Sequence, residues 1–210
     1  MARPDNDRIA RIFDAMARQY DSRIGVAERR LLDRPRQWAV EHAQGRVLEL
    51  AVGTGLNLPL YGSAVTEVVG IDISEGMLDL ARHRISEGGL DRCEVRRCDA
   101  QALDLPDESI DTVLSTIAFC TIPDPLRAAT EALRVLVPGG RAVLAEHGPS
   151  TNRVVTAMMR VVEPMSIRFG ADHLTRDPVL YLAEGGFVID EVQRVGFAGI
   201  GIRVLAHKPA

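Results

Sequence analysis

A glycine-rich turn follows a short apolar run near residue 50. The run is Val47-Leu48-Glu49-Leu50, and Gly53-Thr54-Gly55 comes shortly after it. The apolar run predicts a buried strand, and the apolar residues after the glycines could open a helix. Backbone without side chains lets several N–H groups point at one ligand, and a helix N-terminus favours negative charge. The turn is therefore predicted to bind a phosphate or a carboxylate.

The turn does not complete the dinucleotide-binding fingerprint. The pattern G-x-G-x-x-G requires a third glycine, but the window from Gly53 ends on Leu58. Glu49 lies inside the preceding strand, where it would repel a pyrophosphate but suits an ammonium or a sulfonium group. The pattern favours a cationic ligand over a nicotinamide dinucleotide.

Two further carboxylates follow the next two predicted strands. Asp72 sits where a carboxylate can accept hydrogen bonds from a pair of ribose hydroxyls. Asp99 could accept from an adenine amine while the N–H of Ala100 serves a ring nitrogen. One such acid alone is more often a turn former or a helix cap. Three acids at successive strands beside a glycine turn point to one ligand, because ligands of open α/β sheets bind outside the carboxyl ends of the strands. Together they predict S-adenosylmethionine (SAM) as the cofactor.

Two histidines are candidates for a general base. His147 ends the fifth predicted strand, and His173 lies in the stretch GADHLTR. A base could remove the proton of a thiol, amine or phenol acceptor. Each histidine also has a structural interpretation: His147 could bond a loop carbonyl, and the stretch around His173 could start a helix capped by Asp172 or Thr175. No cluster of His, Cys and Asp has the sequence spacing of a metal site, so no metal is expected.

The elements that position these residues alternate between strands and helices. Helices are predicted over 8–20, 28–42, 75–84 and 126–136. Strands are predicted within the runs 47–50, 67–74 (ending at Asp72), 93–100, 110–119, 141–147, 187–195 and 200–208, with a turn at Pro138-Gly139-Gly140. This alternation predicts an α/β fold with a mostly parallel sheet and helices on both faces. The short loop from Gly196 to Gly199 permits only an antiparallel hairpin at the end.

Bulk properties narrow the class of protein. A chain of 210 residues with 46% hydrophobic content suits one compact domain. A net charge of -4 argues against a broad nucleic-acid footprint. The start lacks a secretory signal and no apolar run approaches the roughly 20 residues of a membrane span, which predicts a cytoplasmic protein. Cys93, Cys98 and Cys120 form no CxxC pair and are expected to be buried, reduced thiols.

Five stretches resemble the class I SAM-dependent methyltransferases. VLELAVGTG resembles their motif I, VVGIDISEGMLDLAR the segment that follows it, and CDAQALDLPDESIDTVLSTIAFCTIPDP the adenine and post-adenine motifs. EALRVLVPGGRAVLAEH is similar to the next helix, turn and strand, and FDAMARQYD to the opening segment of the ubiquinone and menaquinone branch. The resemblance covers roughly 12–147 and implies a Rossmann-like sheet. HLTRDPVLYLAEGGF resembles the methyltransferase-like thiol S-methyltransferases, and the bacterial phosphatidylethanolamine N-methyltransferases are a third similar group.

The resemblance implies a role for individual positions. It places Glu49, Gly53 and Gly55 around the methionine end of the cofactor, Asn57 on its carboxylate, Asp72 on the ribose, Ile73 and Met77 against the adenine, Asp99 and Ala100 on the adenine edge, Ser115 and Thr116 near the sulfonium, and Tyr20 over the cofactor. The family usually has glycine where this chain has Ala51, and a methyl group there should take up room in the turn.

Four segments are expected within the single domain: an N-terminal helical lid (1–45), a cofactor-binding core (46–147), a substrate-facing insertion (148–185) and a closing hairpin (186–210). In the insertion, Val154, Met158, Val161 or Val162, and Met165 share one helical face. Such a stripe is more often core, while adaptable methionines would also suit an apolar acceptor. The arginines Arg8, Arg11, Arg18, Arg23, Arg29 and Arg30 are predicted to form a solvated helix face, with contact to an anionic membrane as the alternative.

The predicted activity is methyl transfer from SAM to oxygen, nitrogen or sulfur of a small, largely apolar acceptor, leaving S-adenosylhomocysteine. The protein would align the acceptor with the C–S bond and exclude water. The alternatives are an NAD(P)-dependent oxidoreductase and a non-catalytic SAM-binding module. Cofactor motifs of this kind serve many unrelated acceptors, so they do not select one.

Overall fold

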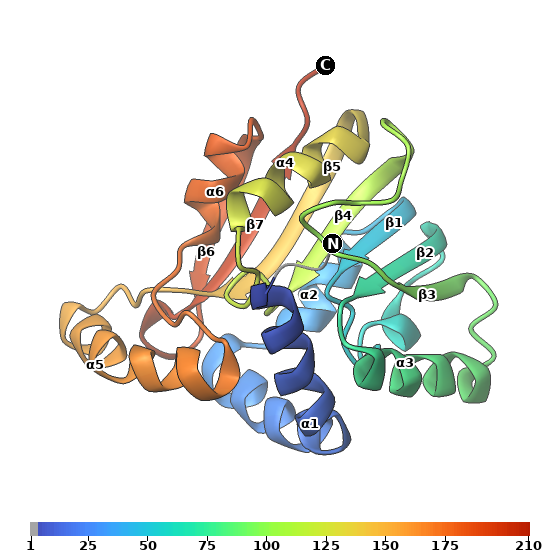
Figure 1. Ribbon diagram of the computed structural model, residues 1–210. Helices are drawn as coiled ribbons and strands as arrows, with labels where there is room; N and C mark the ends of the chain where they lie inside the picture. The colour runs from blue at the N-terminus through green and yellow to red at the C-terminus, as the bar shows by residue number, and fades with distance from the viewer. Residues whose placement is uncertain (1–3) are drawn as a thin grey trace.

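A seven-stranded sheet with the order β3-β2-β1-β4-β5-β7-β6 forms the centre of the molecule (Figure 1). The computed structural model describes residues 4–210. The strands are β1 (Gly45–Leu50), β2 (Val65–Asp72), β3 (Cys93–Arg97), β4 (Ile110–Thr116), β5 (Leu136–His147), β6 (Val188–Val195) and β7 (Gly201–His207). Strands β1 to β5 pair in parallel, whereas β7 pairs antiparallel with β5 and with β6. The predicted mostly parallel sheet with a closing hairpin is confirmed.

Helices cover both faces of this sheet. They are α1 (Pro4–Ala27), α2 (Pro35–Glu41), α3 (Glu75–Gly88), α4 (Pro125–Val135), α5 (Arg153–Gly170) and α6 (Pro178–Glu184). Successive strand residues point to opposite faces, so Val47 packs with residues of α2 and α3 while Leu48 packs with residues of α4 and α6. The sequences of the central strands are therefore nearly continuous apolar runs, as in sheets that are buried on both faces.

The predicted helix after the glycine turn is wrong. Only a short 3₁₀ turn, Leu58–Leu60, stands between β1 and β2. Pro59 lies in its first turn and has no N–H to donate, and Gly62 follows in the loop, two residues after Leu60. The glycine turn therefore presents its own backbone to a ligand, without a helix dipole behind it.

Two other predicted elements are interrupted. The expected helix over 28–42 is broken at Asp33 and Arg34, which have φ values of 52° and 54°, so a π-helical turn (Glu28–Leu32) and α2 replace it. The predicted turn at 138–140 lies within β5, where the pairing steps from Ile110 with Leu136 to Thr112 with Arg141. The intervening residues form a bulge, which Gly139 permits with φ 74°.

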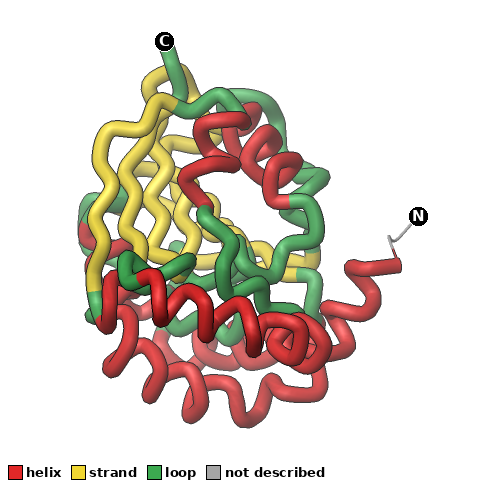
Figure 2. Tube along the Cα trace, turned by 90° about the vertical axis from the view of Figure 1, so that its left-hand side faces the viewer, coloured by secondary structure: helices red, strands yellow, loops and turns green. Residues whose placement is uncertain are grey.

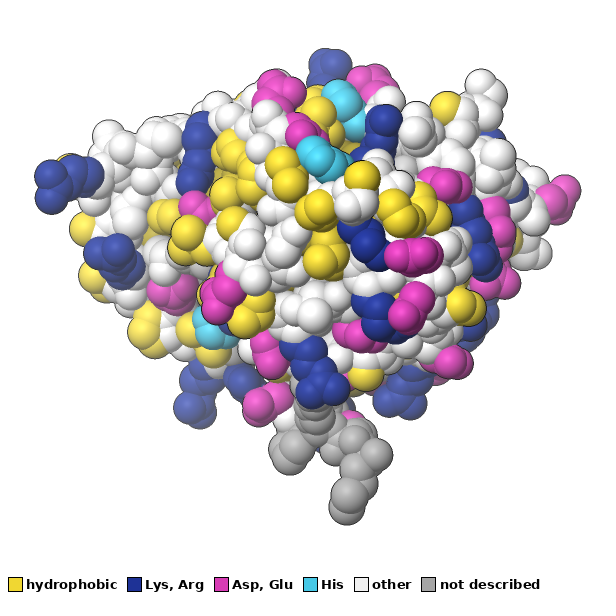
Figure 3. Space-filling view, turned by 90° about the horizontal axis from the view of Figure 1, so that it is seen from above, with side chains coloured by type: hydrophobic (Ala, Val, Ile, Leu, Met, Phe, Trp, Pro, Cys, Tyr) yellow, Lys and Arg dark blue, Asp and Glu magenta, His cyan; other side chains and the backbone are white. Residues whose placement is uncertain are grey.

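The apolar stripe of the insertion is not core. α5 has no buried residue, and Val154, Met158, Val161 and Met165 are 69%, 65%, 78% and 66% exposed. In contrast, the side of the molecule that faces upward in Figure 1 has acidic and basic side chains interspersed with hydrophobic ones (Figure 3). Within residues 4–210, no helix combines the length and apolarity that crossing a bilayer requires.

Candidate functional site

A cavity opens at the carboxyl ends of β1, β2, β3 and β4. It is lined by Asn6, Ile9, Phe13, Tyr20, Ala51, Gly53, Ile71, Asp72, Ile73, Met77, Cys98, Asp99, Ala100, Gln101, Ile117, Ala118, Thr121, Ile122 and Pro123. The chain leaves β1 toward β2 on one side and later returns to β4 on the other, so this is the switch point where open α/β sheets bind ligands.

Asp72 joins the two loops that frame the cavity. Its Oδ2 accepts a hydrogen bond from the Gly53 N–H at 3.0 Å, and its Oδ1 accepts one from the Ser74 N–H at 2.8 Å. Burial raises the pKa of Asp72 to about 6, although these backbone donors act in the opposite direction. A fixed acceptor of this kind suits a pair of hydroxyl groups.

Asp99 lines the same cavity. Its Oδ2 accepts from the Asn6 amide at 2.7 Å, and its Oδ1 accepts from the backbone and side chain of Gln101 at 2.9 Å. Oδ1 already accepts from two donors, but Oδ2 accepts from one and can take a second, so Asp99 keeps capacity for a ligand amine. Ala100 follows it in the cavity wall.

The two glycines of the turn have different surroundings. Gly53 has φ 57°, and a Cβ there would have only the Ala51 carbonyl oxygen, 4.0 Å away, as its neighbour. Gly55 has φ 78°, but a Cβ there would lie 2.7 Å from Leu58 Cδ1 and 3.2 Å from Ala81 Cβ. Gly53 thus leaves the cavity wall bare, whereas Gly55 lets the turn pack on α3. Ala51 is itself left-handed, with φ 49°, which explains why glycine is the easier residue there.

Glu49 does not line the cavity. It is 1% exposed beneath the turn, where Oε1 accepts from the Asn57 amide at 2.8 Å and Oε2 accepts from the Tyr61 hydroxyl at 2.7 Å. Burial raises the pKa of Glu49 to about 7, against the effect of these donors and of Arg36. Glu49 and Asn57 therefore support the turn from below.

A second, smaller hollow shares Tyr20, Ala51 and Gly53 with the first. Arg36 reaches its wall from α2, and this residue has no counterpart in the sequence predictions. Its Nε donates to Glu28 at 2.7 Å, and its Nη1 lies 3.2 Å from Asn57 Oδ1. Burial opposes a charge on Arg36, but Glu28 outweighs burial and raises its pKa. The hollow thus holds a fixed cation beside the bare backbone of Gly53.

Helix α1 passes across the carboxyl ends of the strands, and its residues form part of the cavity wall (Figures 1 and 2). Asp14 Oδ1 accepts from the Ser74 hydroxyl at 2.6 Å and from the Gly76 N–H at 2.9 Å. Asp21 accepts from the Thr54 hydroxyl at 2.6 Å. Tyr20 lies between the two hollows, and burial raises its pKa to about 12, so the phenol stays protonated.

The remaining predicted positions divide into two groups. Ile73 and Met77 line the main cavity, and Thr116 lines the second hollow. Ser115 is turned away, because its hydroxyl donates to Glu146 at 2.7 Å. Glu146 was not foreseen: it is 2% exposed, accepts from the Ala118 N–H, and burial raises its pKa to about 7. It fixes the loop that forms one cavity wall.

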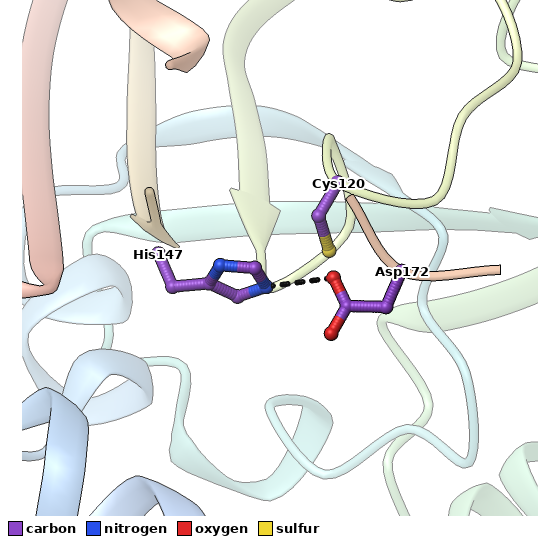
Figure 4. Close-up of side chains that lie close together, drawn as sticks. All are labelled: Cys120, His147 and Asp172. Atoms are coloured by element: carbon purple, nitrogen blue, oxygen red, sulfur yellow. Dashed lines mark ion pairs between the residues drawn. The ribbon is translucent and has the colours of Figure 1, made fainter. Parts of the chain in front are cut away.

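Neither candidate histidine lines the cavity. His147 Nε2 lies 3.1 Å from Asp172 Oδ1, and Cys120 stands beside the pair (Figure 4). Burial lowers the pKa of His147, but the Asp172 carboxylate outweighs it and leaves the pKa raised. One ligand atom from each of the three residues lies within 4.8 Å of the others, and these are donor types that zinc accepts. Sequence spacing does not indicate this cluster, because its members are far apart in the chain.

His173 is held through its backbone, whose N–H donates to the Cys120 carbonyl at 3.1 Å. Burial and the charge of Arg176 lower the pKa of its ring. The predicted cap at Asp172 or Thr175 is wrong, since Asp177 caps α6 by accepting from the Val179 N–H. The 171–176 segment is thus hydrogen-bonded to the 117–123 loop, which forms one wall of the cavity.

Replacing His147 by asparagine is expected to destabilise the fold more than it slows turnover. Loss of the buried ion pair should cost about 2 kcal/mol, or about 5 °C in Tm. Because the pKa of His147 is raised, the charged pair contributes fully below the unfolded pKa of about 6.5 and less as the pH rises through the folded value. Melting curves should show that the difference in Tm between wild type and His147→Asn becomes smaller as the pH rises. Unchanged melting with a large loss of kcat would instead make His147 catalytic.

Comparison with known proteins agrees with this geometry. The sequence pattern of the methyltransferase domain family matches residues 48–144. The chain is 36% identical to the phosphatidylethanolamine N-methyltransferase of Cereibacter sphaeroides over 85% of this chain and 90% of that protein. It is 29% identical to the ubiquinone/menaquinone biosynthesis C-methyltransferase of Geobacter sulfurreducens, over 96% and 83% of the two chains.

Solved structures show the same fold. A SAM-dependent methyltransferase from Thermotoga maritima superposes with a TM-score of 0.71 at 23% identity, over 94% of this chain and 99% of that one. These comparisons give no support to the oxidoreductase alternative. The bare turn, the acids at the strand ends and the relatives agree, and the chain belongs to the SAM-dependent methyltransferases.

Proposed function

We propose that this chain binds SAM across the two adjoining hollows and transfers its methyl group to a small, largely apolar acceptor. The observation that carries the proposal is a single cavity with Asp72 and Asp99 in its wall and a buried cation, Arg36, in the adjoining hollow. These donors and acceptors fit the ribose, adenine and carboxylate of SAM, respectively. SAM supplies a methyl group on a sulfonium, whose transfer requires an in-line nucleophile and little acid–base help.

The residues of the chain would divide the work of binding. Asp72 would accept hydrogen bonds from the ribose hydroxyls. Ile73 and Met77 would pack on the adenine, whose edge would hydrogen-bond with Asp99 and the Ala100 N–H. The Gly53 backbone and Arg36 would hold the methionine end, with Tyr20 and Thr116 beside it. Glu49, Gly55, Asn57 and Ser115 would keep the turn and the strand end in place. The 1–45 segment would act as a lid that excludes water once α1 closes.

Apolar side chains form part of the cavity wall, among them Ile9, Phe13, Ile117 and Ile122. Two relatives that cover most of the chain are named for phosphatidylethanolamine and for ubiquinone and menaquinone, which combine a reactive group with a long apolar part. We infer an acceptor of this class, with a nucleophilic atom at the end of a hydrocarbon body. The unpaired cysteines agree with a cytoplasmic location.

The test is methyl transfer from isotopically labelled SAM to a panel of acceptors: an ethanolamine lipid, a demethylated quinol, an alkyl thiol and a water-soluble phenol. Mass spectrometry should find label in at least one of the apolar acceptors and little in the soluble phenol. A chain that binds S-adenosylhomocysteine but labels none of them would be a non-catalytic SAM-binding module.

A further inference from the structure

Six large apolar side chains on α5 face solvent. Val154, Met158, Val161, Val162, Met165 and Phe169 are 69%, 65%, 78%, 51%, 66% and 65% exposed. At about 100° per residue these positions fall within an arc of about 100° on the helix, so they form one continuous stripe, here called the α5 stripe. A soluble protein rarely leaves such a surface uncovered.

Positive charge borders the α5 stripe on one side. Arg153, Arg160 and Arg168 are exposed, and their helical positions place all three along the same flank. No ion pair involves any of them within residues 4–210. The one acid of α5, Glu163, points the other way and accepts from the Thr175 hydroxyl and N–H. The flank is therefore free to meet an anion.

The basic surface continues onto α1, which lies beside α5 at the lower side of the molecule in Figure 1. A groove between the two helices is lined by Arg8, Arg11, Arg23, Arg168 and Phe169 together with Ile12, Ala15, Met16 and Gln19. The described lining contains four arginines and no acid. Arg8 also donates to the carbonyls of Ile167 and Arg168, which fixes the two helices to each other.

We propose that the α5 stripe docks in the interface of an anionic phospholipid membrane, with the arginine flank on the phosphate groups. An exposed apolar face bordered by arginines is the pattern of helices that lie in a bilayer surface, where arginine stems follow the hydrocarbon and the guanidinium groups reach the headgroups. The complementary charge favours this occupant over a second copy of the chain, which would bring another arginine flank rather than phosphates. The inference does not depend on the proposed methyl transfer.

Sedimentation with phosphatidylglycerol vesicles tests the docking. The wild type should bind at low salt, bind more weakly as salt screens the arginines, and bind phosphatidylcholine vesicles poorly. The double variant Met158→Glu/Met165→Glu should lose at least about tenfold in affinity, because two charges would enter the apolar layer. The matched control is Leu180→Glu/Val188→Glu, which adds the same charge at exposed apolar positions of α6 and β6 and should keep wild-type binding.

Melting curves and S-adenosylhomocysteine titration should be the same for both double variants, which shows that the fold is intact. Failure of the wild type to bind phosphatidylglycerol vesicles would overturn the proposal. So would equal losses in the two double variants. A concentration-dependent dimer that the Met158→Glu/Met165→Glu change abolishes, without vesicle binding, would assign the stripe to a second copy instead.

Discussion

Replacing Asp72 by asparagine should weaken S-adenosylhomocysteine binding by about 100-fold, which corresponds to about 3 kcal/mol. The carboxylate holds the N–H groups of Gly53 and Ser74 and offers its remaining acceptor sites to the cavity. An asparagine keeps one acceptor oxygen and turns the other into a donor, so it would break one loop contact and lose the charge. Isothermal titration calorimetry measures the change directly.

The pH dependence separates this role from general damage. Burial raises the pKa of Asp72 to about 6, and hydroxyl donors prefer the ionised carboxylate. Wild-type affinity should therefore fall as the pH drops below about 6, while the Asp72→Asn variant should lack this fall. Asp79 is an exposed acid of α3, the helix that follows Asp72, so Asp79→Asn is the matched control and should bind as wild type. Equal affinities for Asp72→Asn and wild type would remove Asp72 from the site.

Replacing Arg36 by methionine should raise the Kd for S-adenosylhomocysteine by about 30-fold, since a charge-assisted contact to a carboxylate is worth about 2 kcal/mol. Methylthioadenosine has no amino-acid carboxylate, so its affinity should change little. Arg36→Lys keeps the charge without the planar fork and should recover part of the loss. The two ligands can be compared in the same calorimeter.

The Glu28 carboxylate would lose its partner in Arg36→Met, so a lower Tm is expected as well. If the loss of this ion pair distorts the lid, the binding of both ligands should weaken by the same factor. Parallel losses for the two ligands would therefore show that Arg36 acts through stability and not through the carboxylate.

The sheet and the two acids of the cavity wall could be predicted from local sequence. The strands are short apolar runs bounded by turn residues, and Asp72 and Asp99 lie at strand ends, where chain order alone brings them to one edge. The helix after the glycine turn could not be read in the same way. Its apolar residues resembled a helix start, but Pro59 and Gly62 allow only one 3₁₀ turn.

Contacts between distant segments were not predictable from the pattern. Asn6 meets Asp99 across 93 positions, and Arg36 reaches the second hollow because α2 follows a break at Asp33 and Arg34. The direction of Glu49 depends on Asn57 and Tyr61 below the turn. Such pairings depend on how separate elements pack, which a single sequence does not encode locally.

The α5 stripe illustrates a limit of periodicity. Spacing identifies an apolar face on a helix, but it does not say whether protein, ligand or lipid covers that face. The commoner reading as core was wrong because the inner side of α5 is formed by other residues, among them Val155, Met159 and Ile167, all partly buried.

The central claim is that the cavity at the carboxyl edge of the sheet holds SAM, and calorimetric titration of the purified chain tests it most directly. The account predicts one S-adenosylhomocysteine per chain, with a Kd on the order of micromolar, and no heat of binding with NADH. Binding of NADH, or no binding of S-adenosylhomocysteine to a chain that melts cooperatively, would contradict it.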